Sequence, residues 1–152
     1  MRTFAIALIA LSTSAFACPD LSGKFAVCRS QTGNTSGSTD MVITQSTSNR
    51  VTTYTVSSTD ADTNERTSET FKADGKTVSN TQTDPDSGMT LSLATTVSCI
   101  GTSSLKINMI VKFNGEVAAN LVQNISKSGK TLVMKTSGSN MGEEMNETVI
   151  CE

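Results

Sequence analysis

Apolar and polar residues alternate most regularly between Ser104 and Thr136, and this stretch predicts three consecutive β-strands. Apolar side chains recur at every second position from Leu105 to Phe113, a period of two that is typical of a strand with one buried face. Asn114-Gly115 predicts a tight turn, the apolar positions resume from Val117 to Ile125, and Ser128-Gly129 predicts a second turn before the third strand. We expect this meander to supply much of the hydrophobic core.

Seven further strands are expected from shorter apolar runs between turn-forming residues. They cover Leu21 to Val27, Met41 to Gln45, Arg50 to Ser57, Arg66 to Ala73, Lys76 to Thr83, Met89 to Cys99 and Glu143 to Cys151. Leu21, Gly23, Phe25 and Val27 are expected to share one face of the first strand. Asp74-Gly75 predicts a hairpin that pairs the fourth strand with the fifth.

Residue composition also favours β-structure. Serine and threonine make up about 30% of the chain, and threonine favours strands while serine favours turns. No helical spacing of apolar residues occurs beyond the first 17 residues. The sequence therefore predicts an all-β protein, an up-and-down antiparallel meander of about eight to ten strands. A closed barrel is the expected form because closure removes exposed strand edges, and a two-sheet β-sandwich is the alternative.

The N-terminus has the pattern of a secretory signal peptide. Arg2 precedes an apolar run from Phe4 to Leu11, and Ala15-Phe16-Ala17 fits an A-x-A cleavage site. The expected organisation is a signal peptide at 1–17 and a single domain at 18–152, without a transmembrane segment. Lipid anchoring through Cys18 is the less favoured alternative, because lipoprotein processing prefers a large aliphatic residue where Ala15 stands.

Four cysteines in an exported chain predict two disulfides. They are Cys18, Cys28, Cys99 and Cys151, and four cysteines allow three pairings, which the sequence leaves open. A structural zinc site is disfavoured because the chain has neither a C-x-x-C pair nor a histidine. The expected location is therefore extracytoplasmic, either periplasmic or secreted.

Gly23-Lys24-Phe25, close to the expected mature N-terminus, resembles the G-x-W opening of lipocalin-like (calycin) barrels, with phenylalanine in place of tryptophan. The resemblance implies a small exported barrel in which the first and last strands pair. It also implies a cavity open at one end, with Phe25 at the closed end.

Inward-facing residues of such a barrel could line a ligand site. The candidate lining residues are Phe25, Leu91, Leu93, Ile107, Met109, Val111, Leu121, Leu132 and Met134. Aliphatic and methionine side chains suit an adaptable apolar pocket, and the alternative is that they simply fill the barrel.

Residues for several other activities are missing. Without histidine, neither a Ser-His-Asp nor a Cys-His arrangement can form, so the chain is predicted not to be an enzyme. Asp60, Asp62 and Asn64 have the early spacing of a calcium loop but lack its later ligands, and no metal or other cofactor is expected. Twelve basic residues against fourteen acidic ones, without stacking aromatics, disfavour nucleic acid as a partner.

We expect the chain to be a monomer. Two candidate functions remain. The first is a carrier of a small hydrophobic ligand inside the barrel. The second is a loop-mediated protein-binding module, an inhibitor or adhesin with a filled barrel, whose partner is an extracytoplasmic protein. Its candidate surfaces are the polar loops Gln31 to Thr39 and Ser137 to Gly142, since binding residues gather on loops held by a rigid scaffold.

Overall fold

Ten β-strands make up the regular structure of the computed structural model, which describes residues 17–32 and 38–152. The strands are β1 (Gly23–Ser30), β2 (Ser38–Ser48), β3 (Val51–Asp60), β4 (Arg66–Lys72), β5 (Thr77–Thr83), β6 (Thr90–Ile100), β7 (Ser104–Phe113), β8 (Glu116–Ser128), β9 (Thr131–Asn140) and β10 (Glu143–Cys151). The expected signal peptide lies outside the described residues except for Ala17. Among the described residues, none forms a helix that could cross a membrane.

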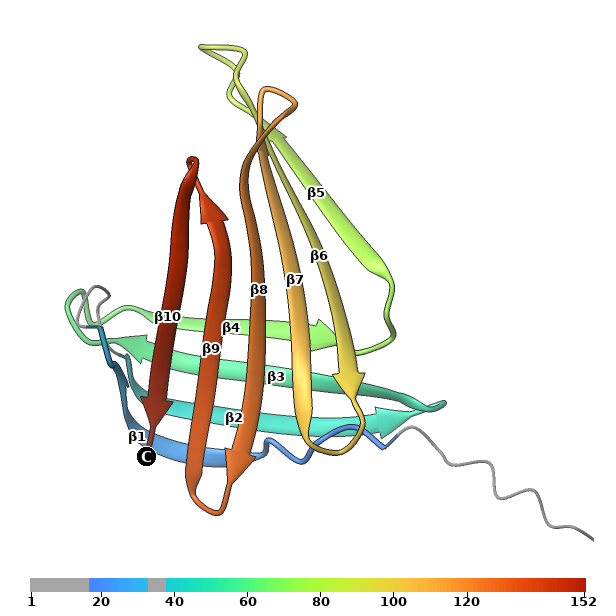
Figure 1. Ribbon diagram of the computed structural model, residues 1–152, viewed down its shortest axis with the longest axis vertical. Coiled ribbons are helices and arrows are strands. Elements are labelled where there is room, and N and C mark those ends of the chain that lie inside the picture. Colours follow the sequence, from blue (N-terminus) through green and yellow to red (C-terminus); the bar gives the residue numbers. More distant parts are fainter. Residues whose placement is uncertain (1–16, 33–37) are drawn as a thin grey trace, which may run out of the picture.

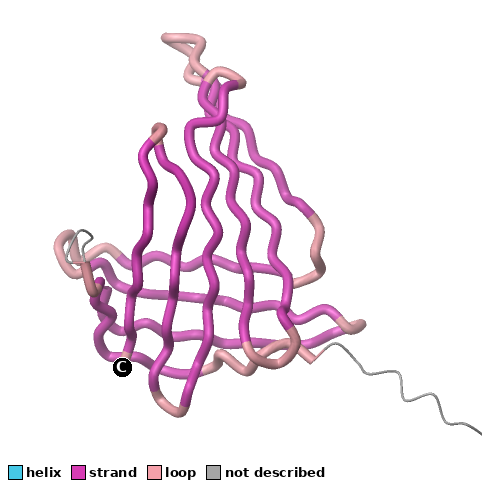
Figure 2. The backbone as a smooth tube through the Cα atoms, in the orientation of Figure 1, coloured by secondary structure: helices cyan, strands magenta, loops and turns pink. Residues whose placement is uncertain are grey.

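All ten strands belong to one antiparallel sheet with the order β4-β3-β2-β1-β10-β9-β8-β7-β6-β5. The all-β prediction and the up-and-down meander are therefore confirmed. β1 pairs with β10 through Cys28 to Ser30. The sheet is strongly curled but open, because its two edges, β4 and β5, do not pair with each other (Figures 1 and 2).

The predicted hairpin at Asp74-Gly75 is wrong. The Asp74 carboxylate accepts a hydrogen bond from the Lys76 amide at 3.0 Å, while the Gly75 amide donates to the Val97 carbonyl at 2.9 Å. Gly75 adopts a φ of +71°, a left-handed conformation that glycine tolerates. The turn therefore carries the chain from one part of the sheet to the other, and the opening of the sheet lies at this connection.

Two predicted loops are shorter than expected. β2 and β3 extend until Asn49 and Arg50 alone form the turn, both with positive φ. The predicted loop from Ser137 to Gly142 is mostly strand, because β9 continues to Asn140. Polar strand ends of this kind resemble loops in sequence, since only backbone pairing with a neighbouring strand distinguishes them.

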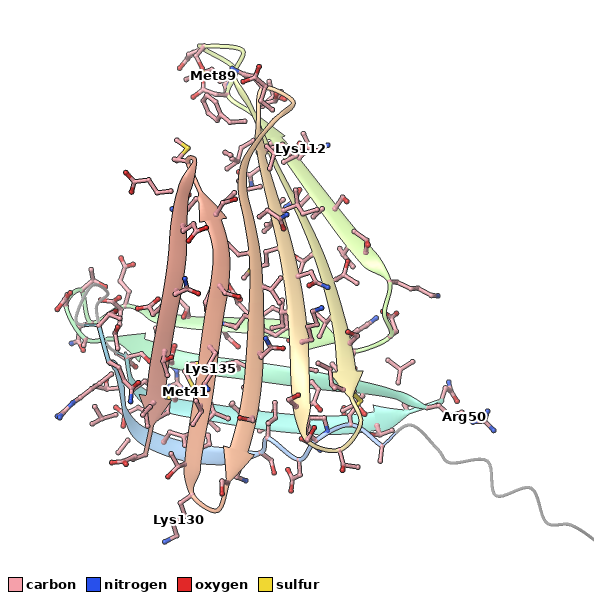
Figure 3. The ribbon with its side chains drawn as sticks, viewed as in Figure 1. Met41, Arg50, Met89, Lys112, Lys130 and Lys135 are labelled. Carbon is pink, nitrogen blue, oxygen red and sulfur yellow. A yellow bond between two sulfur atoms is a disulfide. The ribbon has the colours of Figure 1, made fainter. Side chains whose placement is uncertain are left out.

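The strands form two halves that cross at a steep angle (Figure 1). β1 to β4 run across the lower part of β6 to β10, and the core lies between the two halves. Met41 belongs to this core, whereas Figure 3 shows Met89 at the distant tip of the sheet, near the ends of β5 and β6. The buried core comprises Leu21, Phe25, Cys28, Met41, Ile43, Tyr54, Val97, Leu105, Ile107, Ile125, Leu132 and Cys151.

A β-bulge in β1 changes which side chains face the core. The amides of Ala26 and Val27 both donate to the Glu152 carbonyl, at 2.6 and 3.3 Å. One residue is thus extra on β1, so Phe25 and Cys28 both point inward although three positions separate them. The prediction that Val27 shares the buried face of Phe25 is wrong for this reason, since Val27 is only half-buried.

Two disulfides hold the sheet, as predicted. Cys18 bonds to Cys99 at the end of β6, and Cys28 bonds to Cys151 across the pairing of β1 with β10. The described residues contain no free cysteine. Both bonds join the beginning of the domain to later strands and indicate an oxidising, extracytoplasmic compartment.

Candidate functional site

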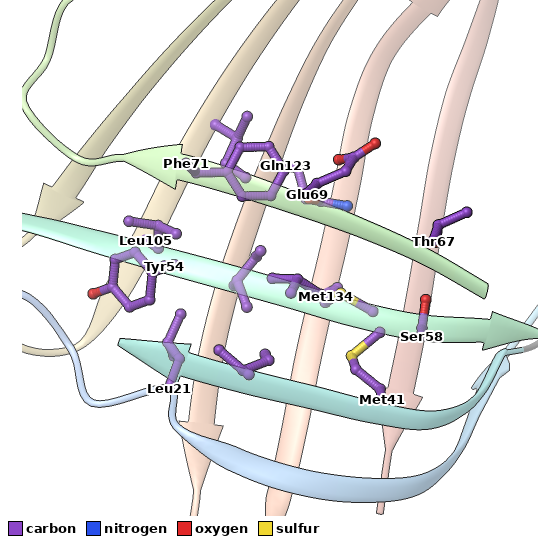
Figure 4. A pocket seen from close by; sticks show the side chains of 14 residues that line it. Leu21, Met41, Tyr54, Ser58, Thr67, Glu69, Phe71, Leu105, Gln123 and Met134 are labelled. Carbon is purple, nitrogen blue, oxygen red and sulfur yellow. The ribbon is translucent and has the colours of Figure 1, made fainter. Parts of the chain in front are cut away.

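A cavity of about 260 Å³ lies between the two halves of the sheet (Figure 4). Its lining comes from strands far apart in sequence, because the crossing of the halves brings β2, β3 and β4 over β7, β8 and β9. The lining residues are Leu21, Met41, Ile43, Tyr54, Val56, Ser58, Thr67, Glu69, Phe71, Leu105, Ile107, Gln123, Ile125 and Met134.

One end of the cavity is apolar and buried. Tyr54, Leu21 and Leu105 gather there (Figure 4), and each is at most 2% exposed. The Tyr54 hydroxyl donates a hydrogen bond to the Pro19 carbonyl at 2.7 Å, so its polar atom is satisfied away from the cavity. This end therefore offers an apolar surface.

The polar part of the lining comes from four residues, and two of these are open to water. Ser58 and Gln123 are half-buried, whereas Thr67 and Glu69 are exposed. The Gln123 amide nitrogen donates to the Thr136 hydroxyl at 3.2 Å, which holds the side chain at the cavity wall. A molecule with one polar and one apolar end could thus place the apolar end deep in the cavity and keep the polar end hydrated.

Tyr54 should titrate at unusually high pH. Burial, together with the negative charge of Asp20, raises the pKa of Tyr54 to about 12. Because an unfolded chain loses this proton near pH 10, we expect the folded protein to lose stability as pH rises from about 10 to 12. Tyr54 is the chain's single tyrosine, so the ultraviolet absorbance of tyrosinate reports it alone. A titration midpoint near 10 in the folded protein would contradict this burial.

The predicted lining residues occupy several different places. Ile107 and Met134 line the cavity, and Leu93 lines a second pocket described below. Phe25 and Leu132 are buried in the core without lining either space. The rest do not line them either: Met109, Val111 and Leu121 are half-buried, and Leu91 is exposed.

Most of the site was missing from the sequence-based candidates, which included only Ile107 and Met134 among the 14 lining residues. Met41, Ile43, Tyr54, Val56 and Phe71 supply the wall formed by β2, β3 and β4. Their period-two spacing was the available signal. It was weak because threonine and serine occupy most neighbouring positions, so these strands looked poor in core residues.

A second pocket of about 220 Å³ lies where β4 and β5 remain unpaired. Phe71 lines both spaces and therefore lies between them. Lys72 and Lys76 contribute the charged part of the second lining, and Val78 and Leu93 contribute apolar parts. The opening of the sheet thus lies beside the main cavity.

The acidic turn at Asp60 organises its own backbone. Its carboxylate accepts hydrogen bonds from the amides of Thr63 and Asp62, at 2.8 and 2.9 Å, and from the Thr63 hydroxyl. These bonds hold the pKa of Asp60 below its usual value. No group of acidic or cysteine side chains in the described part of the chain is arranged to hold a metal ion.

No family model, curated protein or solved structure matches this chain. The protein is therefore classified by its own structure. It is a disulfide-bonded, ten-stranded antiparallel sheet, curled into an open half-barrel around a cavity that is largely apolar.

Proposed function

We propose that this protein is an exported, non-enzymatic carrier of a small hydrophobic ligand, held between the two halves of the sheet. The cavity of about 260 Å³ carries this proposal. Ligand pockets usually measure about 300 to 1,000 Å³, so the space lies just below that range and suits one alkyl chain or a small ring compound. Its buried apolar end and hydrated polar side are the arrangement that such a ligand needs.

The compartment and the N-terminal resemblance are consistent with this function. Two disulfides fit export, and the A-x-A pattern ending at Ala17 would release a mature chain that starts at Cys18. The Gly23-Lys24-Phe25 resemblance to lipocalin-like barrels supports an interior ligand. The absence of histidine from the sequence supports a binding protein rather than an enzyme.

A protein-binding module is the second candidate. The observation that favours it is a group of exposed apolar side chains, since Leu91, Leu93 and Phe113 are 42 to 47% exposed near the far ends of β6 and β7. Exposed apolar groups of this kind can mark an interaction surface. The predicted binding loop from Ser137 to Gly142 is mostly paired strand, and residues 33–37 of the other predicted loop, Gln31 to Thr39, lie outside the described residues.

Filling the cavity should prevent ligand uptake. Val56 lines the cavity and is half-buried, so Val56→Phe is expected to abolish binding of N-phenylnaphthylamine, a neutral fluorescent probe, by occupying its space. Stability should change little, because a cavity accepts volume that a close-packed core resists at a cost of about 1 to 3 kcal/mol. Probe fluorescence and thermal unfolding measure the two effects.

Val122→Phe is the matched control. Val122 is also half-buried but lies on the opposite face of β8 from Leu121 and Gln123, so this variant should bind the probe as the wild type does. A wild-type protein that binds no probe, together with a Val56→Phe variant that melts at a lower temperature, would indicate a filled interior. That pattern would reject the carrier and favour the protein-binding module.

A further inference from the structure

The charged part of the cavity lining is acidic. Among its lining residues Glu69 is the single acidic side chain, and no lysine or arginine lines it. Glu69 is exposed and comes from the edge strand β4, so its carboxylate lies at the hydrated side of the cavity. Any charged ligand group that enters here meets a negative charge.

The lysines close to the cavity do not line it. Lys127 follows Ile125 on the inward-facing side of β8, but its ammonium donates a hydrogen bond to the Ser22 carbonyl and it does not line the cavity. Lys72 is next to Phe71 in β4 and so projects to the opposite face from Glu69 and Phe71. Lys72 and Lys76 line the second pocket, beyond Phe71.

Glu69 also has an aromatic neighbour that suits a cation. Glu69 and Phe71 are two residues apart on β4 and therefore share its inner face, and both line the cavity (Figure 4). A cation attracted by the carboxylate can also interact favourably with the face of an aromatic ring. A carboxylate ligand would instead bring a second negative charge against Glu69, which is unfavourable.

On these observations we propose that the ligand is a single-chain amphiphile with a cationic, alkylammonium-like head group. Its head pairs with Glu69, and its alkyl chain extends toward Tyr54 and Leu105 at the buried end. The proposal rests on the carrier function above and adds the charge of the ligand. Anionic amphiphiles such as fatty acids are disfavoured at this position.

Three probes with the same alkyl chain test the head-group preference: dodecylammonium, neutral dodecyl maltoside and dodecanoate, each titrated by calorimetry below its micelle concentration. We expect the wild type to bind dodecylammonium most tightly and dodecanoate most weakly. Glu69→Gln should weaken dodecylammonium binding by about twofold to fivefold, the range for an exposed ion pair, and leave dodecyl maltoside binding unchanged.

Glu116→Gln is the matched control, because it makes the same change in charge at an exposed position at the start of β8, outside the cavity. It should leave dodecylammonium binding unchanged. Equal binding of all three probes, or equal weakening by both variants, would overturn the charge preference while leaving the carrier intact. Preferred binding of dodecanoate, weakened by Lys72→Gln, would overturn it in favour of an anionic head at the second pocket. Failure of every probe to bind would reject the carrier itself and this proposal with it.

Discussion

Replacing both Cys28 and Cys151 by alanine is expected to lower the free energy of unfolding by about 4 to 5 kcal/mol. The bond closes a loop with a sequence separation of 123 residues, and the chain-entropy model gives a value near this for so long a loop. It also joins β1 to β10, whose pairing includes only three register positions. Because small domains are stable by roughly 5 to 15 kcal/mol, the variant should lose a large fraction of its free energy of unfolding.

Urea unfolding of this variant and of Cys18→Ala/Cys99→Ala measures the effect. The second bond has a sequence separation of 81 residues and ties down only the segment before β1, so we expect the Cys28 and Cys151 variant to be the less stable of the two. Equal midpoints for the wild type and the Cys28 and Cys151 variant would show that the first and last strands hold together without their disulfide.

Gly138→Ala is expected to destabilise the protein by about 3 to 5 kcal/mol. Gly138 has a φ of +142°, which side chains disfavour, and it lies within β9 opposite Leu121 of β8. A Cβ atom at this position would overlap the backbone carbonyl of Asn120. Since that carbonyl belongs to the neighbouring strand, β8 and β9 would have to separate locally.

Gly129→Ala is the control variant, because it introduces the strain of a left-handed residue without the steric clash. Gly129 also has a positive φ, +61°, but a Cβ there meets no atom within 4 Å. We expect this control to cost only about 1 to 2 kcal/mol, the strain of a left-handed residue. Similar unfolding free energies for the two variants would contradict the close approach of Asn120 to Gly138.

Local patterns in the sequence predicted most of the strands. The region from Ser104 to Thr136 matches β7, β8 and the first part of β9 because alternation and the turns at Asn114-Gly115 and Ser128-Gly129 agree there. Asp74-Gly75 has equally good hairpin residues, yet the strands on either side of it, β4 and β5, do not pair with each other. A turn dipeptide fixes the local backbone, but whether the flanking strands pair depends on the curvature of the whole sheet.

The site was harder to predict because it is made by the crossing of the two halves. Period-two alternation identifies the inner face of β7 but does not say which of its residues meet the opposite half. Ile107 meets the opposite half and lines the cavity, whereas Phe113 at the far end of the strand is exposed. The bulge at Ala26 and Val27 likewise depends on the Glu152 carbonyl, 125 residues or more away in the chain, which no local pattern in β1 reveals.

The location of a bound probe tests the carrier most directly. Residues 18–152 contain six isoleucines, of which Ile43, Ile107 and Ile125 line the cavity and Ile100, Ile110 and Ile150 do not. With isoleucine methyl groups labelled for NMR, we expect magnetisation transfer from bound N-phenylnaphthylamine to the first three and not to the others. Transfer to Ile100, Ile110 or Ile150 alone, with no signal from the cavity methyl groups, would contradict a ligand site between the two halves of the sheet.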